Sequence, residues 1–364
     1  MNGHIRGTIV PVEEVDRHLM LRRRSEARGL RKALASGSVV RIHCGAYLDA
    51  DYLRSLPDRW HATRAVGLAR ILATSLDRQV TVIGASAAIL HGVPQLDPSP
   101  PVHLWAPTRP GGTSPPLPAV RLPHGGIVPA GRTLVHTGAA LGSDFSLASG
   151  RESVGALDTL PLAGAIASAT LIAPPRDSFV LASGGIRMMC GFDRRRQDHS
   201  RVEEESARAQ LLDMVHALPA RTRNRRVALW TLHNADAGCE SVGEALLLWI
   251  LRSHGIVGTL TQVRVAAGSR TYYIDIGIPG VLLAIEFDGS AKYGEDGEEV
   301  LDAFKGQERR QKDIEREGFL VLRFRWSELR DPPAVLSELR ARLASVGRTL
   351  PVDPSATLTS FLHG

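Results

Sequence analysis

Three carboxylates stand inside an otherwise apolar stretch, YYIDIGIPGVLLAIEFDG, at residues 272–289. Its β-branched and aliphatic residues predict two buried strands joined by a Pro-Gly turn. An ionised carboxylate in a dry interior costs several kcal/mol unless something compensates its charge. Asp275, Glu286 and Asp288 therefore need partners, and the nature of these partners constrains both the fold and the chemistry of the chain.

The predicted hairpin brings the three acids together. With the Pro-Gly pair at the centre of the turn, Asp275 is expected opposite Ala284 and diagonal to Glu286. Residues two apart on a strand point the same way, so Asp275, Glu286 and Asp288 should share one face. Diagonal neighbours lie roughly 7 to 8 Å apart at the backbone, close enough for two carboxylates to converge on one cation. The opposite face is expected to enter the core through Ile274, Ile276, Val281, Leu283, Ile285 and Phe287.

Two kinds of partner can compensate these acids. Oxygen ligands suit Mg²⁺ or Mn²⁺, whereas the dispersed histidines and the three scattered cysteines disfavour a zinc site. The alternative is ion pairing with Arg323 or Arg325 in the apolar segment FLVLRFRW at 319–326. The first interpretation predicts a metal site, and the second predicts a structural ion-pair network.

The chain from about residue 239 predicts one mixed α/β domain. Ser241 is a plausible N-cap, and Glu244 follows three residues later as in a capping box. The expected order is a helix, three strands, a charged helix and a closing strand. The segments are ESVGEALLLWILRSHG (240–255), TLTQVRV (259–265), TYYIDIGI (271–278), VLLAIEFD (281–288), EEVLDAFKGQERRQKDIEREG (298–318) and FLVLRFRW (319–326).

These motifs in this order resemble the small nuclease-like family related to the very-short-patch-repair endonuclease, within the PD-(D/E)xK superfamily. The similarity covers about residues 239–330. It implies a restriction-endonuclease-like domain that hydrolyses phosphodiester bonds with Mg²⁺ or Mn²⁺. By the resemblance, Asp275 and Glu286 are metal ligands, the Phe287 carbonyl is a further ligand, and Glu244 is an additional acidic group.

One position departs from the superfamily pattern. Asp288 stands where a lysine is usual, although an acid before the following glycine is the expected form in this subfamily. The resemblance implies Lys292, Gln311 or Lys312 as the compensating polar group. Each residue also has a structural interpretation: Glu244 as a helix cap, Asp288 as a turn residue and Lys292 as a solvated loop lysine.

Basic residues gather near the N-terminus, with eight Lys or Arg and one acid from residue 17 to residue 41. Two helical segments, VEEVDRHLM and SEARGLRKALASG, precede the hairpin sequence SVVRIHCGAYL. This outline predicts a winged helix-turn-helix in which Leu30 and Leu34 pack inward. The alternative is a small solvated pair of basic helices. The residues expected to contact DNA are Arg28, Arg31, Lys32 and Arg41.

A second resemblance covers the N-terminal region. The stretches LRKALASGSVVRIHCGAYL, SAAILHGVP and VHLWAPT are similar to winged-helix antitoxins of the AbiEi type. This similarity implies DNA as a partner and raises a toxin protein as another. The expected division is a winged helix at 1–58, a mixed α/β middle region at 59–235, a nuclease-like domain at 236–348 and a tail at 349–364.

Composition agrees with a DNA-binding role without establishing it. The net charge of +6 favours polyanionic partners. No apolar run of about 18 residues and no signal-peptide pattern occur, so the sequence predicts a cytoplasmic protein that does not enter a membrane. The charged segment FDRRRQDHSRVEEES at 192–206 is expected to be a solvated surface.

Two functions remain open at this point. One is a metal-dependent DNA endonuclease whose winged helix supplies affinity for duplex DNA. The other is a non-catalytic DNA-binding regulator or antitoxin that retains a nuclease fold. The set of carboxylates favours the first, and the missing lysine favours the second.

Overall fold

The computed structural model describes residues 10–21, 27–76, 80–108, 115–137, 150–289 and 297–363, with backbone only at 27–28, 297–304 and 362–363. The chain divides into two compact units. Unit 1 comprises residues 1–181 and 209–228, and unit 2 comprises residues 182–208 and 229–364. The predicted mixed α/β class with several sheets is confirmed. The domain boundaries predicted from the sequence remain predictions.

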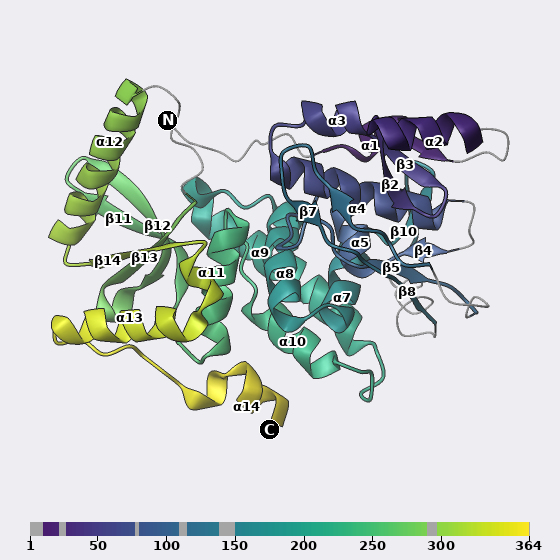
Figure 1. The fold of residues 1–364 in the computed structure, drawn as a ribbon. Coiled ribbons are helices and arrows are strands. Elements are labelled where there is room, and N and C mark those ends of the chain that lie inside the picture. Colours follow the sequence, from purple (N-terminus) through teal and green to yellow (C-terminus); the bar gives the residue numbers. More distant parts are fainter. Residues whose placement is uncertain are drawn as a thin grey trace. The chain divides into compact units, whose positions relative to one another are not determined.

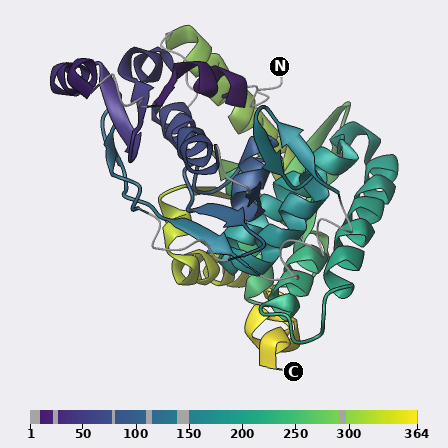
Figure 2. The ribbon, with the colours of Figure 1, turned by 90° about the vertical axis from the view of Figure 1, so that its right-hand side faces the viewer.

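Unit 1 starts with a small antiparallel sheet of order β1-β3-β2, beside which α2 lies (Figure 2). Gly45 joins β2 to β3 with a φ of +80°, a conformation that side chains with a Cβ rarely adopt. Leu34 is 39% exposed in the last turn of α2, where no described element covers it, so its inward packing was predicted wrongly. The elements are α1 (Val12–His18), β1 (Leu19–Leu21), α2 (Ala27–Ser36), β2 (Val39–His43), β3 (Ala46–Asp49) and α3 (Ala50–Ser55).

The rest of unit 1 is built on a mixed five-stranded sheet of order β8-β5-β4-β10-β9 (Figure 1). The described strands are β4 (Thr81–Val82), β5 (Val102–Trp105), β8 (Thr133–His136), β9 (Glu152–Val154) and β10 (Leu157–Thr159), with a separate hairpin of β6 (Val120–Arg121) and β7 (Ile127–Val128). Helices α4 (Arg59–Ser75), α5 (Gly84–Leu90) and α7 (Leu162–Ile172) complete this part.

Two buried arginines of α4 bond to backbone carbonyls elsewhere in unit 1. Arg70 is 1% exposed, and its Nη2 donates to the carbonyls of Pro118 and Pro129 at 2.7 and 2.8 Å. Arg64 is equally buried and donates to the Ile89 carbonyl at 3.1 Å. Burial lowers the pKa of Arg64 to about 10. Arg70 thus satisfies two carbonyls that lie outside the strands, which helps to order the irregular segment around Pro118 and Pro129.

Three helices contribute residues to both units: α8 (Pro175–Cys190), α9 (Gln197–His216) and α10 (Arg225–Asn234). None of the helices in the described part of the chain is both long enough and apolar enough to cross a bilayer.

Unit 2 contains a four-stranded sheet of order β11-β12-β13-β14. The pair β13 and β14 is parallel and the others are antiparallel. Parallel strands need a crossover, and α12 lies between them in the chain. The predicted order of helix, three strands, helix and strand is present. The elements are α11 (Val242–Ser253), β11 (Leu260–Ala267), β12 (Arg270–Ile278), β13 (Leu283–Asp288), α12 (Gly297–Arg316), β14 (Leu320–Arg325), α13 (Pro332–Ser345) and α14 (Leu358–His363).

The core of this sheet follows the predicted pattern in part. Four of the expected residues are at most 1% exposed: Ile274, Ile276, Leu283 and Ile285. Val281 belongs to the turn and Phe287 is partly exposed at the end of β13, so these two were predicted wrongly. Ile314 of α12 packs into the same core cluster as Ile274.

The register of β12 and β13 differs by two residues from the prediction. Gly277, rather than Asp275, pairs with Ala284. The connection is a 3-10 turn at Pro279–Val281 followed by one left-handed residue, which is longer than a two-residue turn. The bridged pairs end at Ile276 and Ile285, and one further step in the same register would bring Asp275 opposite Glu286. The two acids are therefore closer neighbours than the sequence predicted.

Candidate functional site

Helix α11 begins with a capped glutamate. Ser241 accepts from the Glu244 backbone N–H at 3.1 Å and donates to Glu244 Oε1 at 2.8 Å. The Glu240 backbone N–H donates to Glu244 Oε2 at 2.7 Å. Ser241 is therefore the N-cap, but the Glu244 carboxylate accepts from the Ser241 hydroxyl and the Glu240 N–H rather than from the Ser241 N–H of a standard capping box. The same contacts fix its carboxylate, which is 8% exposed.

Asp275 lies on β12 and bonds to the neighbouring strand β13. Its Oδ2 accepts from the Phe287 backbone N–H at 3.0 Å. Burial, then the charge of Glu286, raises the pKa of Asp275 to about 7. Burial, then the charge of Asp275, raises the pKa of Glu244 to about 8. We call Glu244, Asp275 and Glu286 the acid cluster, because Glu286 acts on the pKa of Asp275 and Asp275 acts on that of Glu244.

Glu286 is paired with two arginines. Arg310 Nη2 of α12 donates to Glu286 Oε1 at 2.6 Å, and Arg323 Nε of β14 donates to Oε2 at 3.1 Å. Arg310 Nη2 also donates to the Tyr273 carbonyl at 2.7 Å. The Arg323 pairing was one of the two alternatives from the sequence. Arg310 was missed, although its position four residues before the buried Ile314 places both on the same face of α12.

Asp288, in the usual lysine position, lies near another arginine. Arg325 Nε is 3.6 Å from Asp288 Oδ2, and the Arg325 side chain is 67% exposed. Such an exposed pair contributes little to stability. Lys292 lies outside the described residues. Gln311 and Lys312 bond along α12, to Glu315 and Glu308, so the structure does not bring them to the acid cluster.

A glycine allows α11 to start against the end of β13. A Cβ at Gly243 would lie 2.1 Å from the ring of Phe287, so a larger residue would push the helix away. The Phe287 ring also meets Trp326 edge-on, with centroids 5.0 Å apart. This packing determines the distance between Glu244 and the strands.

The donor chemistry of the acid cluster fits a small hard cation. Asp275 and Glu286 offer the carboxylate oxygens that Mg²⁺ and Mn²⁺ prefer. Within the described residues, no three His, Cys, Asp or Glu side chains are arranged to hold a metal ion together. Both oxygens of Glu286 already accept from arginine, so a cation has to compete for them.

The N-terminal basic residues lie on the surface of unit 1. Arg31 and Lys32 are exposed on α2, and Arg41 is exposed on β2. Arg41 Nε donates to the His43 carbonyl at 3.4 Å. The Arg28 side chain lies outside the described residues. The three described side chains are therefore accessible to a large anionic partner.

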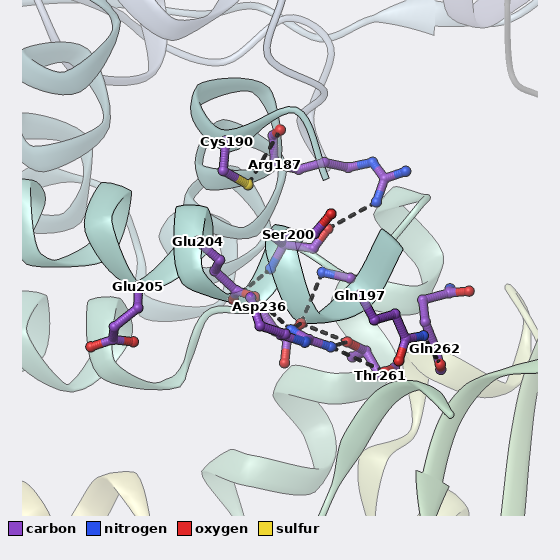
Figure 3. Close-up of polar contacts among 12 residues, drawn as sticks. Arg187, Cys190, Gln197, Ser200, Glu204, Glu205, Asp236, Thr261 and Gln262 are labelled. Carbon is purple, nitrogen blue, oxygen red and sulfur yellow. Dashed lines mark hydrogen bonds and ion pairs between the residues drawn. The ribbon is translucent and has the colours of Figure 1, made fainter. Parts of the chain in front are cut away.

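The charged segment at 192–206 is mostly exposed, as the sequence predicted, but one of its acids is buried. Glu204 is 2% exposed and accepts from Arg201 Nη1 at 2.5 Å and from Arg208 Nη2 at 2.6 Å (Figure 3). Asp236 is 6% exposed and accepts from Arg201 at 2.8 Å. Arg201, Glu204 and Arg208 lie three and four residues apart on one face of α9, which faces the interior of unit 2. The buried ion-pair network consists of Arg201, Glu204, Arg208, Asp236 and Arg252.

Asp236 is the most strongly perturbed acid of this network. Burial alone would raise its pKa, but Arg252 and Arg201 outweigh burial and hold the pKa of Asp236 well below its usual range. Thr261 Oγ1 and the Gly238 backbone N–H donate to Asp236 Oδ1 at 2.6 and 2.8 Å. The carboxylate is thus ionised and compensated, in contrast to Asp275.

Unit 2 combines a mixed four-stranded sheet with an acid cluster assembled from a helix start and two neighbouring strands. No known protein-family model matches the chain, and neither a curated protein nor a solved structure is detectably similar to it.

Proposed function

We propose that the chain is a DNA-binding, metal-dependent endonuclease, with an N-terminal winged helix-turn-helix and a C-terminal restriction-endonuclease-like domain. The observation that best supports this is the acid cluster of unit 2, in which burial and the charge of Glu286 raise the pKa of Asp275, and burial and the charge of Asp275 raise the pKa of Glu244. A divalent cation relieves such repulsion. Asp275 and Glu286 would hold Mg²⁺ or Mn²⁺, with the Phe287 carbonyl as a further ligand.

The cation would supply a water of lowered pKa and would neutralise charge on the phosphorus. The remaining tasks fall to the chain itself. The Phe287 N–H orients the Asp275 carboxylate, and the Ser241 cap orients Glu244. With a pKa of about 8, Glu244 can hold or release a proton near neutral pH. Asp288 and Lys292 complete the proposed set of site residues.

A specific observation favours a second function. Arg310 and Arg323 already compensate Glu286, and no lysine follows it at position 288. A site stabilised in this way needs no metal. In this alternative the protein is a cytoplasmic DNA-binding regulator or an antitoxin with a toxin partner, and the nuclease-like fold serves as a scaffold.

A plasmid assay separates the two functions. With the full chain and Mn²⁺, supercoiled plasmid is expected to become nicked, and chelation of the metal should stop the reaction. Duplex binding with no nicking in either Mg²⁺ or Mn²⁺ would favour the regulator instead.

The DNA-binding part of the proposal predicts a salt effect at α2. Arg31→Ala combined with Lys32→Ala should weaken duplex binding, because each phosphate contact contributes a slope of about 0.9 to the dependence of log affinity on log salt. Removing two contacts should reduce the slope by about 1.8, measured by fluorescence anisotropy at several salt concentrations. A control with the same charge change is Arg340→Ala with Arg342→Ala, two exposed arginines of α13. An unchanged slope in the α2 variant would rule out these contacts.

A further inference from the structure

Arg310 and Arg323 each donate to a different oxygen of the Glu286 carboxylate. They reach one carboxylate from different elements, Arg310 from α12 and Arg323 from the neighbouring strand β14. Glu286 and Arg323 are register partners in the parallel pair. Their side chains are 32% and 24% exposed, so neither arginine is fully enclosed.

Each arginine also keeps a donor that is not used. Arg310 Nε and Arg323 Nη2 are buried atoms with no hydrogen-bond partner among the described residues. Burying such a donor without a partner costs more than a typical hydrogen bond contributes. One carboxylate therefore does not satisfy two guanidinium groups, and a shift of these groups toward another acceptor would let the unused donors form hydrogen bonds.

A phosphodiester group matches these donors. It carries one negative charge on two non-bridging oxygens, and guanidinium groups bind such oxygens with paired, charge-assisted hydrogen bonds. Both arginines bond to Glu286, a member of the acid cluster, so an anion held by them would be next to that cluster. A carboxylate from another protein is a poorer candidate ligand, because the Glu286 carboxylate already bonds to both arginines.

We propose that Arg310 and Arg323 bind the non-bridging oxygens of a DNA phosphodiester, and that in the absence of DNA they rest on Glu286. This inference rests on the proposed function, since it names the substrate contacts of the same site. It predicts that the two guanidinium groups move from Glu286 to the phosphate when DNA arrives. Glu286 is then released from both hydrogen bonds at the moment the substrate is in place.

The probe for this contact is thymidylyl-thymidine, which has a single phosphodiester, titrated into the full chain with EDTA present and followed by ³¹P NMR. Arg310→Gln and Arg323→Gln should each weaken binding about tenfold or more, as expected for loss of a charge-assisted bond. Arg309→Gln is the matched control, because Arg309 is the exposed neighbour on α12 and the charge change is the same. Its binding should be unchanged.

Glu286→Gln should change the affinity for the dinucleotide in the opposite direction, which a purely structural role of the two arginines would not do. Without the competing charge, the arginines should bind the dinucleotide several-fold more tightly than in the wild type. If Arg310→Gln does not fold, Arg310→Lys can replace it in the assay. Lysine keeps the positive charge but lacks the two parallel N–H donors of guanidinium, so this variant should also bind the dinucleotide more weakly. Circular dichroism at the assay temperature confirms that each variant is folded.

The outcomes separate this inference from the proposed function. Equal binding by the wild type, Arg310→Gln and Arg323→Gln, or equal losses in Arg309→Gln, would overturn the inference even if plasmid is nicked. Binding that depends on the two arginines, without any nicking in Mn²⁺, would support the phosphate contacts and end the nuclease proposal alone.

Discussion

Asp275→Asn is expected to reduce Mn²⁺-dependent plasmid nicking by about 10²- to 10⁴-fold, because loss of a charged ligand removes several kcal/mol of transition-state stabilisation. The substitution is nearly isosteric, and an asparagine oxygen can still accept from the Phe287 N–H. The fold should therefore survive. Nicking by this variant at the wild-type rate would show that Asp275 takes no part in the reaction.

The same variant should change how stability depends on pH in the absence of metal. The pKa of Asp275 is raised to about 7 in the folded protein, above an unfolded value of about 3.9. The folded state thus holds the extra proton between these values, and wild-type stability should fall as pH rises from about 4 to 7. At about 1.36 kcal/mol per pH unit, the loss is roughly 4 kcal/mol.

Calorimetric melting of both proteins at pH 5 and pH 8 measures this effect. Asp275→Asn should lose less stability than the wild type over this interval and should be the more stable protein at pH 8. If the substitution instead lowers stability at pH 8, Asp275 is a compensated structural acid, and the repulsion on which the acid cluster depends is absent.

Glu204→Gln is expected to destabilise the metal-free protein by about 3–5 kcal/mol, since it removes one partner of a buried ion pair. Its carboxylate is bonded to Arg201, Arg208 and the Ala237 N–H. Glutamine keeps one acceptor, but its amide group faces the guanidinium groups as a second donor. The measurement is urea denaturation followed by circular dichroism.

The adjacent Glu205 offers a matched control. Its side chain is 74% exposed and lies 3.4 Å from Arg208 Nε, so Glu205→Gln should change stability by no more than about 0.5 kcal/mol. Both variants alter the net charge equally, and Figure 3 labels both residues. Similar losses in the two variants would mean that net charge, rather than the buried ion-pair network, governs the stability of unit 2.

The sequence predicted the elements of unit 2 better than their register. The apolar strand residues and the Ser241 cap carry local signals, because burial and capping depend on nearby positions. The turn after β12 does not, since Leu282 takes a left-handed φ of +46° that its residue type does not favour. The prediction therefore missed the two-residue difference in register between β12 and β13.

The partners of the buried charges were hard to predict for a different reason. Arg323 follows from strand alternation, but Arg310 reaches Glu286 only after α12 packs on the sheet, a contact between residues 24 positions apart. Likewise, the burial of Glu204 could not be predicted from its charged neighbours, because its partner Arg201 also bonds to Asp236, 35 positions away in the chain. Long-range packing, rather than composition, decides whether such charges are exposed.

The central claim is that Asp275 and Glu286 bind a divalent cation, and calorimetric melting with and without Mn²⁺ tests it most directly. A ligand that binds only the folded state raises stability by about 2.7 kcal/mol at a hundred times its dissociation constant. Mn²⁺ should therefore raise the melting temperature of the wild type and leave that of Asp275→Asn unchanged. If saturating Mn²⁺ does not change the melting temperature of the wild type, the account is contradicted. The charge of Glu286 is then compensated by Arg310 and Arg323 alone.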